Sequence, residues 1–152
     1  MSGILGSLHS KSGIMGKVDC PRFRGTDNDA NGPADDMATR LWDPAGQIHE
    51  DTHSWWNTSS HRYTPQLAGT YFVGFQSNFH SNSNTGWANM RKNGTAFAIC
   101  YKVASDTWVQ NTGFSFIFMN GSTDYIDFQV LGYIDGGNFW NLGQIYYMGE
   151  FA

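Results

Sequence analysis

The stretch Tyr63-Thr-Pro-Gln-Leu-Ala-Gly-Thr-Tyr-Phe-Val-Gly-Phe75 decides the fold, because a turn in it leads directly into an aromatic strand. Pro65 fixes its own φ angle and holds the residue before it in an extended conformation. Gly69 tolerates backbone angles that other residues resist. The pattern predicts a tight corner followed by a β-strand over residues 70–75.

Four later segments also alternate as strands do, with apolar side chains at every second position. They cover residues 95–103, 113–119, 124–131 and 144–151. The sequence Arg91-Lys-Asn-Gly94 precedes the first of them and predicts a hairpin turn, because Asn-Gly supplies the positive φ angles of a primed turn.

The rest of the chain gives weaker signals. Residues 20–24 are a candidate edge strand, and the Ser, Asn, His and Gly content of residues 76–88 predicts an exposed loop. Short strands joined by turn-rich loops, with no convincing helix, predict an all-β, antiparallel two-sheet sandwich over residues 19–152.

The segment 113–119 is apolar on both faces. Phe114, Phe116 and Phe118 share one face, and Ile117 and Met119 lie on the other. One face of a sandwich strand fills the core, so the other is most simply covered by copies of the same subunit.

The composition excludes several classes of protein. The 152 residues include 6 Trp, 7 Tyr, 11 Phe and 18 Gly, which favours strands and turns over a helical bundle. The sequence has no membrane span or secretion signal, and we expect assembly in a cytoplasm. Cys20 and Cys100 are too few for a disulfide scaffold, so two reduced thiols are favoured over a single bridge.

The charge distribution argues against a nucleic-acid partner. The net charge is −4, and all 9 Lys and Arg residues lie at or before Lys102. A phosphate backbone requires a basic face, which these scattered residues do not supply.

Residues 1–18 have the composition of an extended N-terminal arm. Two similar pieces, Ser2-Gly-Ile-Leu-Gly6 and Ser12-Gly-Ile-Met-Gly16, carry its main apolar residues, which are Ile4, Leu5, Ile14 and Met15. Burying so little apolar surface does not offset the conformational entropy lost when the arm becomes ordered. The arm therefore needs another surface to dock on. That surface is either a packing contact or a larger assembly.

Two motifs suggest metal sites, and both are weak. Asp27, Asp29, Asn31 and Asp35 match part of a calcium loop, but Ala38 stands where a bidentate Glu belongs. We therefore favour an ordinary turn and expect no metal and no cofactor.

The sequence His49-Glu-Asp-Thr-His53 matches the zinc-protease pattern, which requires a helix to bring both imidazoles to one face. Pro44 and Gly46 before it, the aperiodic residues after it and the lack of a third ligand argue against a zinc hydrolase. No other catalytic motif is present, so we expect a protein that is not an enzyme.

Four short motifs in the right order resemble a known family. Arg62-Tyr-Thr-Pro65 with Gly69-Thr-Tyr71, Arg91-Lys-Asn-Gly94, Thr123-Asp-Tyr-Ile126 and Tyr147-Met-Gly149 resemble the jelly-roll domain of the complement component-1-q and tumour necrosis factor superfamily, in the form found in phage virion proteins. Thr123 replaces that family's usual Gly, and Trp55-Trp56 has no counterpart in it. The arm is similar to the openings of virion proteins from environmental tailed phages.

The resemblance implies a homotrimeric, non-enzymatic virion protein that decorates the capsid or forms part of a fibre or tail. The arm would dock on other virion proteins, with neither nucleic acid nor membrane insertion involved. The expected trimer interface consists of Phe114, Phe116, Phe118, Tyr147 and Phe151. The alternative is a receptor-binding or glycan-binding knob on a tail fibre, with Trp55, Trp56, Trp87 and Trp108 as candidates for stacking on host sugars, although Trp is more often buried.

Overall fold

The computed structural model describes residues 20–26, 40–44, 47–79, 86–102, 109–131 and 141–150. The described residues form only strands: β1 (Arg22–Thr26), β2 (Arg40–Leu41), β3 (Ile48–Asp51), β4 (Trp56–Asn57), β5 (Arg62–Tyr63), β6 (Ala68–Phe79), β7 (Gly86–Lys92), β8 (Thr95–Lys102), β9 (Val109–Asn120), β10 (Ile126–Leu131) and β11 (Leu142–Gly149). No helix in this part of the chain is long and apolar enough to span a membrane.

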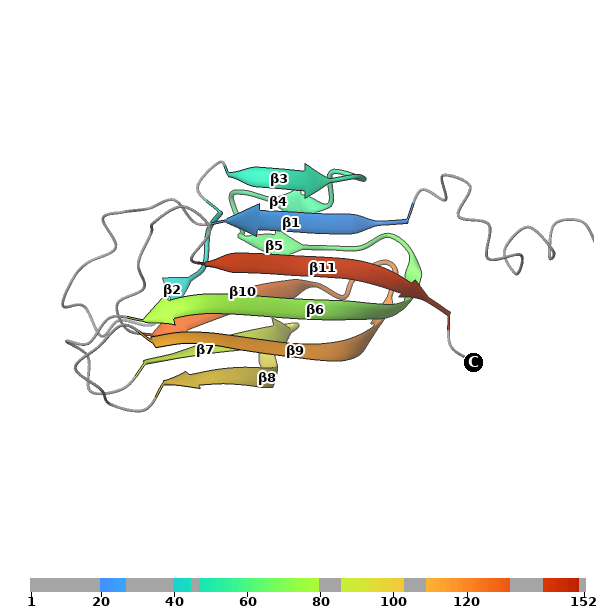
Figure 1. Ribbon diagram of the computed structural model, residues 1–152. Coiled ribbons are helices and arrows are strands. Elements are labelled where there is room, and N and C mark those ends of the chain that lie inside the picture. Colours follow the sequence, from blue (N-terminus) through green and yellow to red (C-terminus); the bar gives the residue numbers. More distant parts are fainter. Residues whose placement is uncertain are drawn as a thin grey trace, which may run out of the picture.

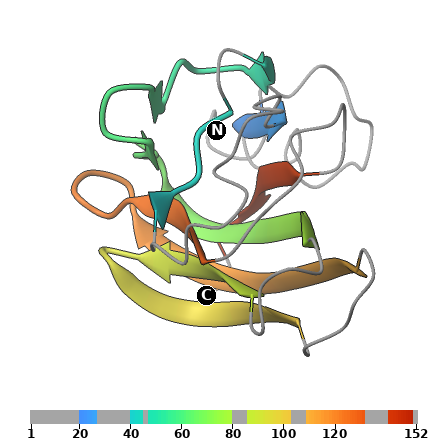
Figure 2. The same ribbon diagram turned by 90° about the vertical axis from the view of Figure 1, so that its left-hand side faces the viewer.

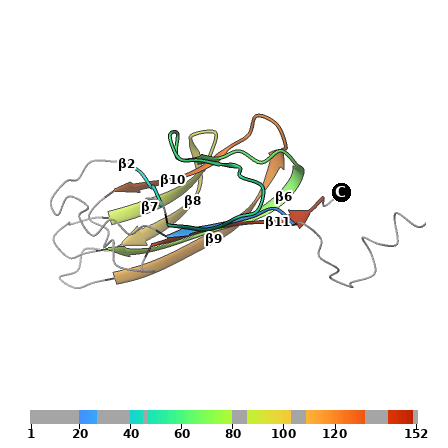
Figure 3. The same cartoon turned by 90° about the horizontal axis from the view of Figure 1, so that it is seen from above.

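The strands form two sheets that pack face to face (Figure 1, Figure 3). The first has the order β3-β1-β11-β6-β9; the second has the order β4-β5-β10-β7-β8, with β2 paired to β10. Every pairing is antiparallel. This arrangement confirms the predicted all-β jelly-roll sandwich.

The edges of the two sheets come together along one side of the sandwich. An end-on view shows β8 and β9, the last strands of their sheets, next to each other (Figure 2). The predicted edge strand at residues 20–24 is wrong in one respect: β1 pairs with β11 on one side and with β3 on the other. The backbone of β1 is therefore paired on both sides, and β3 forms the edge of the sheet.

The corner at residues 63–69 has the predicted form. Gly69 has a φ of 147°, and a Cβ atom there would lie 2.5 Å from the Tyr147 ring, so only glycine fits. The Tyr71 hydroxyl donates a hydrogen bond to the Leu67 carbonyl at 2.8 Å and fastens the corner to the strand.

The strand after the corner is longer than predicted. It runs from Ala68 to Phe79, with Ser77 and Asn78 buried, so residues 76–79 are strand rather than exposed loop. Ser77 and the Asn78 backbone both donate to the Asn141 side-chain oxygen at 3.0 Å, which satisfies polar groups that a sequence pattern marks as loop. Trp87, also expected in that loop, belongs to β7.

The predicted hairpin between β7 and β8 is confirmed. Asn93 and Gly94 have φ angles of 51° and 79°, as a primed turn requires. A register shift after Met90 places Ala98 opposite Met90 and Ala96 opposite Arg91. This bulge breaks the simple alternation predicted for residues 95–103.

The core between the sheets is largely aromatic. Phe23 stacks on Trp56 with ring centroids 4.5 Å apart, and Trp42 meets both Phe75 and Phe128 edge-on at 5.4 Å. The inward residues predicted for 124–131, namely Ile126, Phe128 and Val130, are all 0% exposed. Aromatic pairs in such geometries add to the free energy gained by burial.

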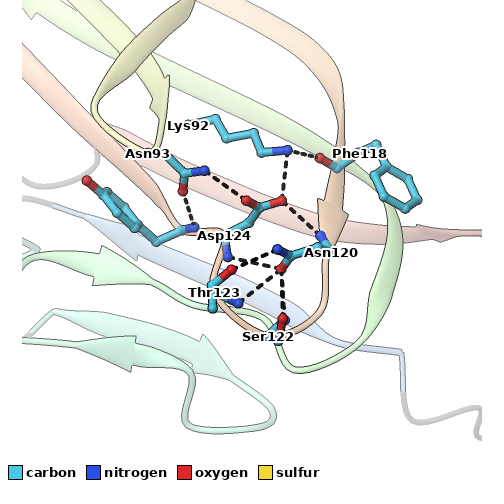
Figure 4. A network of polar contacts seen from close by, with 8 residues as sticks. Lys92, Asn93, Phe118, Asn120, Ser122, Thr123 and Asp124 are labelled. Atoms are coloured by element: carbon cyan, nitrogen blue, oxygen red, sulfur yellow. Dashed lines mark hydrogen bonds and ion pairs between the residues drawn. The ribbon is translucent and has the colours of Figure 1, made fainter.

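A polar network joins the ends of the two sheets (Figure 4). Asp124 accepts hydrogen bonds from Asn93 at 2.8 Å and from the Asn120 backbone at 2.9 Å, and it pairs with Lys92 at 2.8 Å. The Lys92 ammonium also donates to the Phe118 carbonyl at 2.7 Å. We call these contacts the Asp124 clip, because they tie the β7–β8 hairpin to the end of β9.

Candidate self-association surface

The outward side of the five-stranded sheet carries a patch of exposed aromatic side chains. Phe114, Phe116 and Phe118 on β9 are 66%, 56% and 54% exposed. Their neighbours on the same side are fixed by the strand registers, which pair Phe116 with Phe72 and Phe72 with Tyr146. We call the following set the aromatic face: Phe72, Phe114, Phe116, Phe118, Tyr146 and Met148.

The patch follows from the period of a strand, in which alternate side chains point to opposite sides. On β9, Met119 is fully buried and Ile117 packs against the core, so the intervening phenylalanines must point outward. Phe72 lies at the centre of the patch, with its ring 5.7 Å from Phe116, 6.0 Å from Phe114 and 6.1 Å from Tyr146. The rings therefore form one contiguous apolar surface.

A polar margin adjoins the aromatic face on the β1 and β3 side. Arg22 pairs in register with Tyr146, and Arg24 pairs with Gln144. The Arg22 guanidinium forms an ion pair with Glu50 at 2.9 Å. Arg24 is half-buried, and its Nε atom has no hydrogen-bond partner.

A shallow hollow of about 90 Å³ interrupts the aromatic face where Gly74 lacks a side chain. Its walls include Phe72, Phe114, Gln76 and Gln144. A Cβ atom at Gly74 would lie 3.1 Å from the Phe72 ring, so the ring already leans over this position.

Tyr147, predicted for the trimer interface, does not lie on the aromatic face. Its ring meets Tyr71 edge-on at 5.2 Å, and its hydroxyl donates to the Ala68 carbonyl at 3.4 Å. Burial, followed by electrostatic interactions with Glu150 and Cys20, raises the pKa of Tyr147. Ile145 is fully buried, so the residue two positions later points to the same inner side.

Phe151, the other candidate from the predicted strand 144–151, lies outside the described residues. Its segment contributes Tyr146 and Met148 to the surface instead, and Met148 is 45% exposed.

The tryptophans considered for sugar binding do not form a common surface. Trp56 is 7% exposed and stacks on Phe23, so it offers no free face, which corrects that assignment. Trp55 is half-buried against Tyr63 and His53. Trp87 lies at the other end of the second sheet, and Trp108 is outside the described residues.

The HExxH segment is a strand and a turn rather than a helix, so it lacks the geometry of the zinc motif. His49 Nε2 lies 2.7 Å from the Thr26 hydroxyl, and His53 Nδ1 lies 2.8 Å from the Thr52 hydroxyl. Within the described ranges, no cluster of three His, Cys, Asp or Glu side chains has the spacing of a metal site.

Several predicted features lie outside the described residues. These are the arm with Ile4, Leu5, Ile14 and Met15, and the calcium candidate Asp27, Asp29, Asn31 and Asp35. Of the two cysteines, Cys20 is a free, half-buried thiol, and the side chain of Cys100 is not described.

Solved structures with the same architecture exist at very low sequence identity. The globular domain of zebrafish complement 1qA superimposes with a TM-score of 0.64 at 11% identity, over 87% of this chain and 99% of that one. Murine APRIL at pH 5.0 gives 0.65 at 9% identity, over 85% and 99%. The tumour necrosis factor Eiger from S. frugiperda gives 0.55 at 10% identity, over 88% and 95%.

The fold is that of complement 1q and tumour necrosis factor domains. No protein-family model and no curated protein matches the sequence. At these identities the comparisons establish the architecture, and they agree with the four motifs in the sequence.

Sequence reasoning missed three members of the aromatic face: Phe72, Tyr146 and Met148. Phe72 could have been found from the alternation of its strand. Tyr71 and Val73 on either side of it are core residues, so the side chain between them points outward. The positions of Tyr146 and Met148 follow once Ile145 is assigned to the core.

Proposed function

We propose that this chain is a non-enzymatic structural protein that forms a homotrimer through its aromatic face. The observation that carries the proposal is the exposure of Phe114, Phe116 and Phe118 in a contiguous patch. A phenylalanine has about 200 Å² of surface, so these three rings alone leave roughly 350 Å² exposed, which is the size of the largest apolar patch on a typical monomer, often a functional surface.

Covering this surface is a substantial driving force. At about 25 cal/mol per Å², its burial is worth roughly 9 kcal/mol per copy before the costs of association are subtracted. A stable interface takes about 800 Å² from each partner, so the polar margin must take part as well. The jelly-roll architecture, together with the family resemblance of the sequence, supports a threefold arrangement.

We further propose that the trimer is part of a bacteriophage virion, as a capsid decoration or a fibre or tail component. The arm of residues 1–18 supports this role, because its sequence resembles the openings of virion proteins and it needs a surface to dock on. Its partners are then other virion proteins, and its location is the particle, after assembly in the host cytoplasm.

The self-association is tested by placing a charge on the patch. Phe116→Lys is expected to reduce the molecular mass in light scattering to that of a monomer, because a buried, unpaired ammonium is costly. Ile99→Lys is the matched control: Ile99 is 52% exposed, close to the 56% of Phe116, but lies on the other sheet. A Phe116→Lys protein with the mass of the wild type would contradict the proposal.

A glycan-binding knob is the second candidate, favoured by the part-exposed rings of Trp55 and Trp87. Such rings can stack on sugar faces. Binding to a glycan array that is lost in Trp87→Ala would support it, and a wild-type protein that binds no glycan would contradict it.

A further inference from the structure

Arg24, at the border of the aromatic face, has a donor group that lacks a partner. It is half-buried, and its Nε atom is buried without a hydrogen-bond partner in the described part of the chain. Arg22, two residues earlier on the same side of β1, is paired with Glu50. Glu50 lies opposite Arg24 across β1 and β3, but its carboxylate pairs with Arg22. A buried N–H without an acceptor is unfavourable, so a group outside this copy of the chain is the natural acceptor for Arg24.

The hollow over Gly74 has the chemistry of such an acceptor. Its lining residues include Phe114, Gln76 and Gln144. An aromatic ring attracts a guanidinium through its π face, and amide oxygens accept its hydrogen bonds. The volume of about 90 Å³ is several times what one water molecule needs, so a planar guanidinium can enter it.

Arg24 and the hollow also lie at the same position along the strand direction, which we call their height on the sheet. The strand registers align Arg24 with Gln144, Gln144 with Gly74, and Gly74 with Phe114, in one row across four strands. Rotation about an axis parallel to the strands does not change height along them. In a cyclic assembly with that axis, the row containing Arg24 in one copy meets the row containing the hollow in the next.

We infer that the guanidinium of Arg24 enters the hollow over Gly74 of the neighbouring copy, against Phe114 and the amides of Gln76 and Gln144. The inference rests on the proposed homotrimer and names the contact that fixes its register. It makes the interface heterologous, because each copy gives its arginine to one neighbour and receives one from the other.

A double-mutant cycle on the full chain tests the contact by sedimentation over a range of concentrations. Arg24→Met keeps the length of the side chain and removes its charge, and Phe114→Leu keeps an apolar residue and removes the ring. A trimer holds three such contacts, so Arg24→Met is expected to raise the midpoint concentration of dissociation about tenfold. In the Phe114→Leu background the same change should have less than about threefold effect, because its acceptor is already lost.

The matched control is Arg62→Met, which removes an arginine of the other sheet whose guanidinium lies over the Tyr125 ring of its own chain. Because Arg62 is outside the aromatic face and its polar margin, its midpoint concentration should stay within about twofold of the wild type. A trimer unaffected by Arg24→Met, or affected equally in both backgrounds, overturns the contact while leaving the trimer standing. A wild-type chain that sediments as a monomer overturns the homotrimer itself, and this inference with it.

Discussion

At the scale of single residues, Asp124 shows how one side chain secures the support of the aromatic face. Burial alone would raise its pKa, but hydrogen bonds from Lys92, Asn93 and the Asn120 backbone, with the charge of Lys92, lower it below the ordinary value of 3.8. Through Lys92, the clip also holds the carbonyl of Phe118. The carboxylate therefore links the second sheet to the strand that carries three of the exposed rings.

The lowered pKa of Asp124 predicts a loss of stability in acid. A depressed carboxyl pKa contributes stability that is present above about pH 4 and is lost as the pH falls through the folded-state pKa. Asp124→Asn is expected to lower the free energy of unfolding by about 1–3 kcal/mol at pH 7. The difference from wild type should shrink below pH 4, which thermal melts at several pH values measure. A difference that does not change with pH would contradict a charged Asp124.

Residue-level prediction failed where burial and orientation decide the role of an aromatic ring. Trp56 and Trp87 are both plausible surface residues in the sequence, yet only the fold places Trp56 against Phe23. Tyr147 was assigned to the wrong side even though its own strand alternates regularly up to that point. The register shift between Tyr147 and Gly149 shows that β11 is irregular at its end, where sequence patterns are least informative.

At the scale of elements, the corner before β6 and the end of β11 depend on each other. Gly69 lies against the Tyr147 ring and the Gly149 carbonyl, whereas a Cβ atom at Gly149 would meet nothing within 4 Å. Both glycines have positive φ angles, 147° and 114°. A substitution at Gly149 therefore has only the cost of backbone strain, whereas one at Gly69 has the cost of a steric clash as well.

Alanine substitutions at these two glycines should differ in their effect on stability. Gly149→Ala is expected to cost about 1 kcal/mol from its backbone angle alone. Gly69→Ala should cost more, by roughly 1–3 kcal/mol, because the Tyr147 ring must also move. Chemical denaturation measures both, and equal losses would show that the corner does not pack as described.

Elements were predicted well where the signal is local and poorly where it depends on distant partners. Asn93-Gly94 defines its hairpin through backbone angles alone. The extension of β6 to Phe79 instead depends on Asn141, 63 residues beyond Asn78 in the chain, which no local pattern reveals. The two-residue strands β2, β4 and β5 are likewise too short for a period to be recognised.

At the scale of the whole molecule, the predicted sandwich and its exposed aromatic strand are both present. The fold was predictable because two-sided apolar strands and turn residues agree along the chain. The assignment of the surface was only partly predictable, since membership of the aromatic face depends on which strands are neighbours. β11 and β6 are adjacent in space but more than 60 residues apart in sequence.

The arm gives a prediction about the assembled particle. Deleting residues 1–16 should leave a soluble, folded trimer that no longer enters virions, because the arm has too little apolar surface to contribute much to the core. Mass spectrometry of purified particles measures the incorporation. Occupancy equal to wild type would contradict the anchoring role, and a trimer that dissociates would assign the arm to oligomerisation.

The homotrimer is the central claim, and the mass of the purified chain in solution tests it most directly. Sedimentation equilibrium of the wild-type protein at micromolar concentration should give three times the monomer mass of 17.0 kDa. A single species at 17.0 kDa would contradict the account, since the exposed rings of Phe114, Phe116 and Phe118 would then face water in the native state.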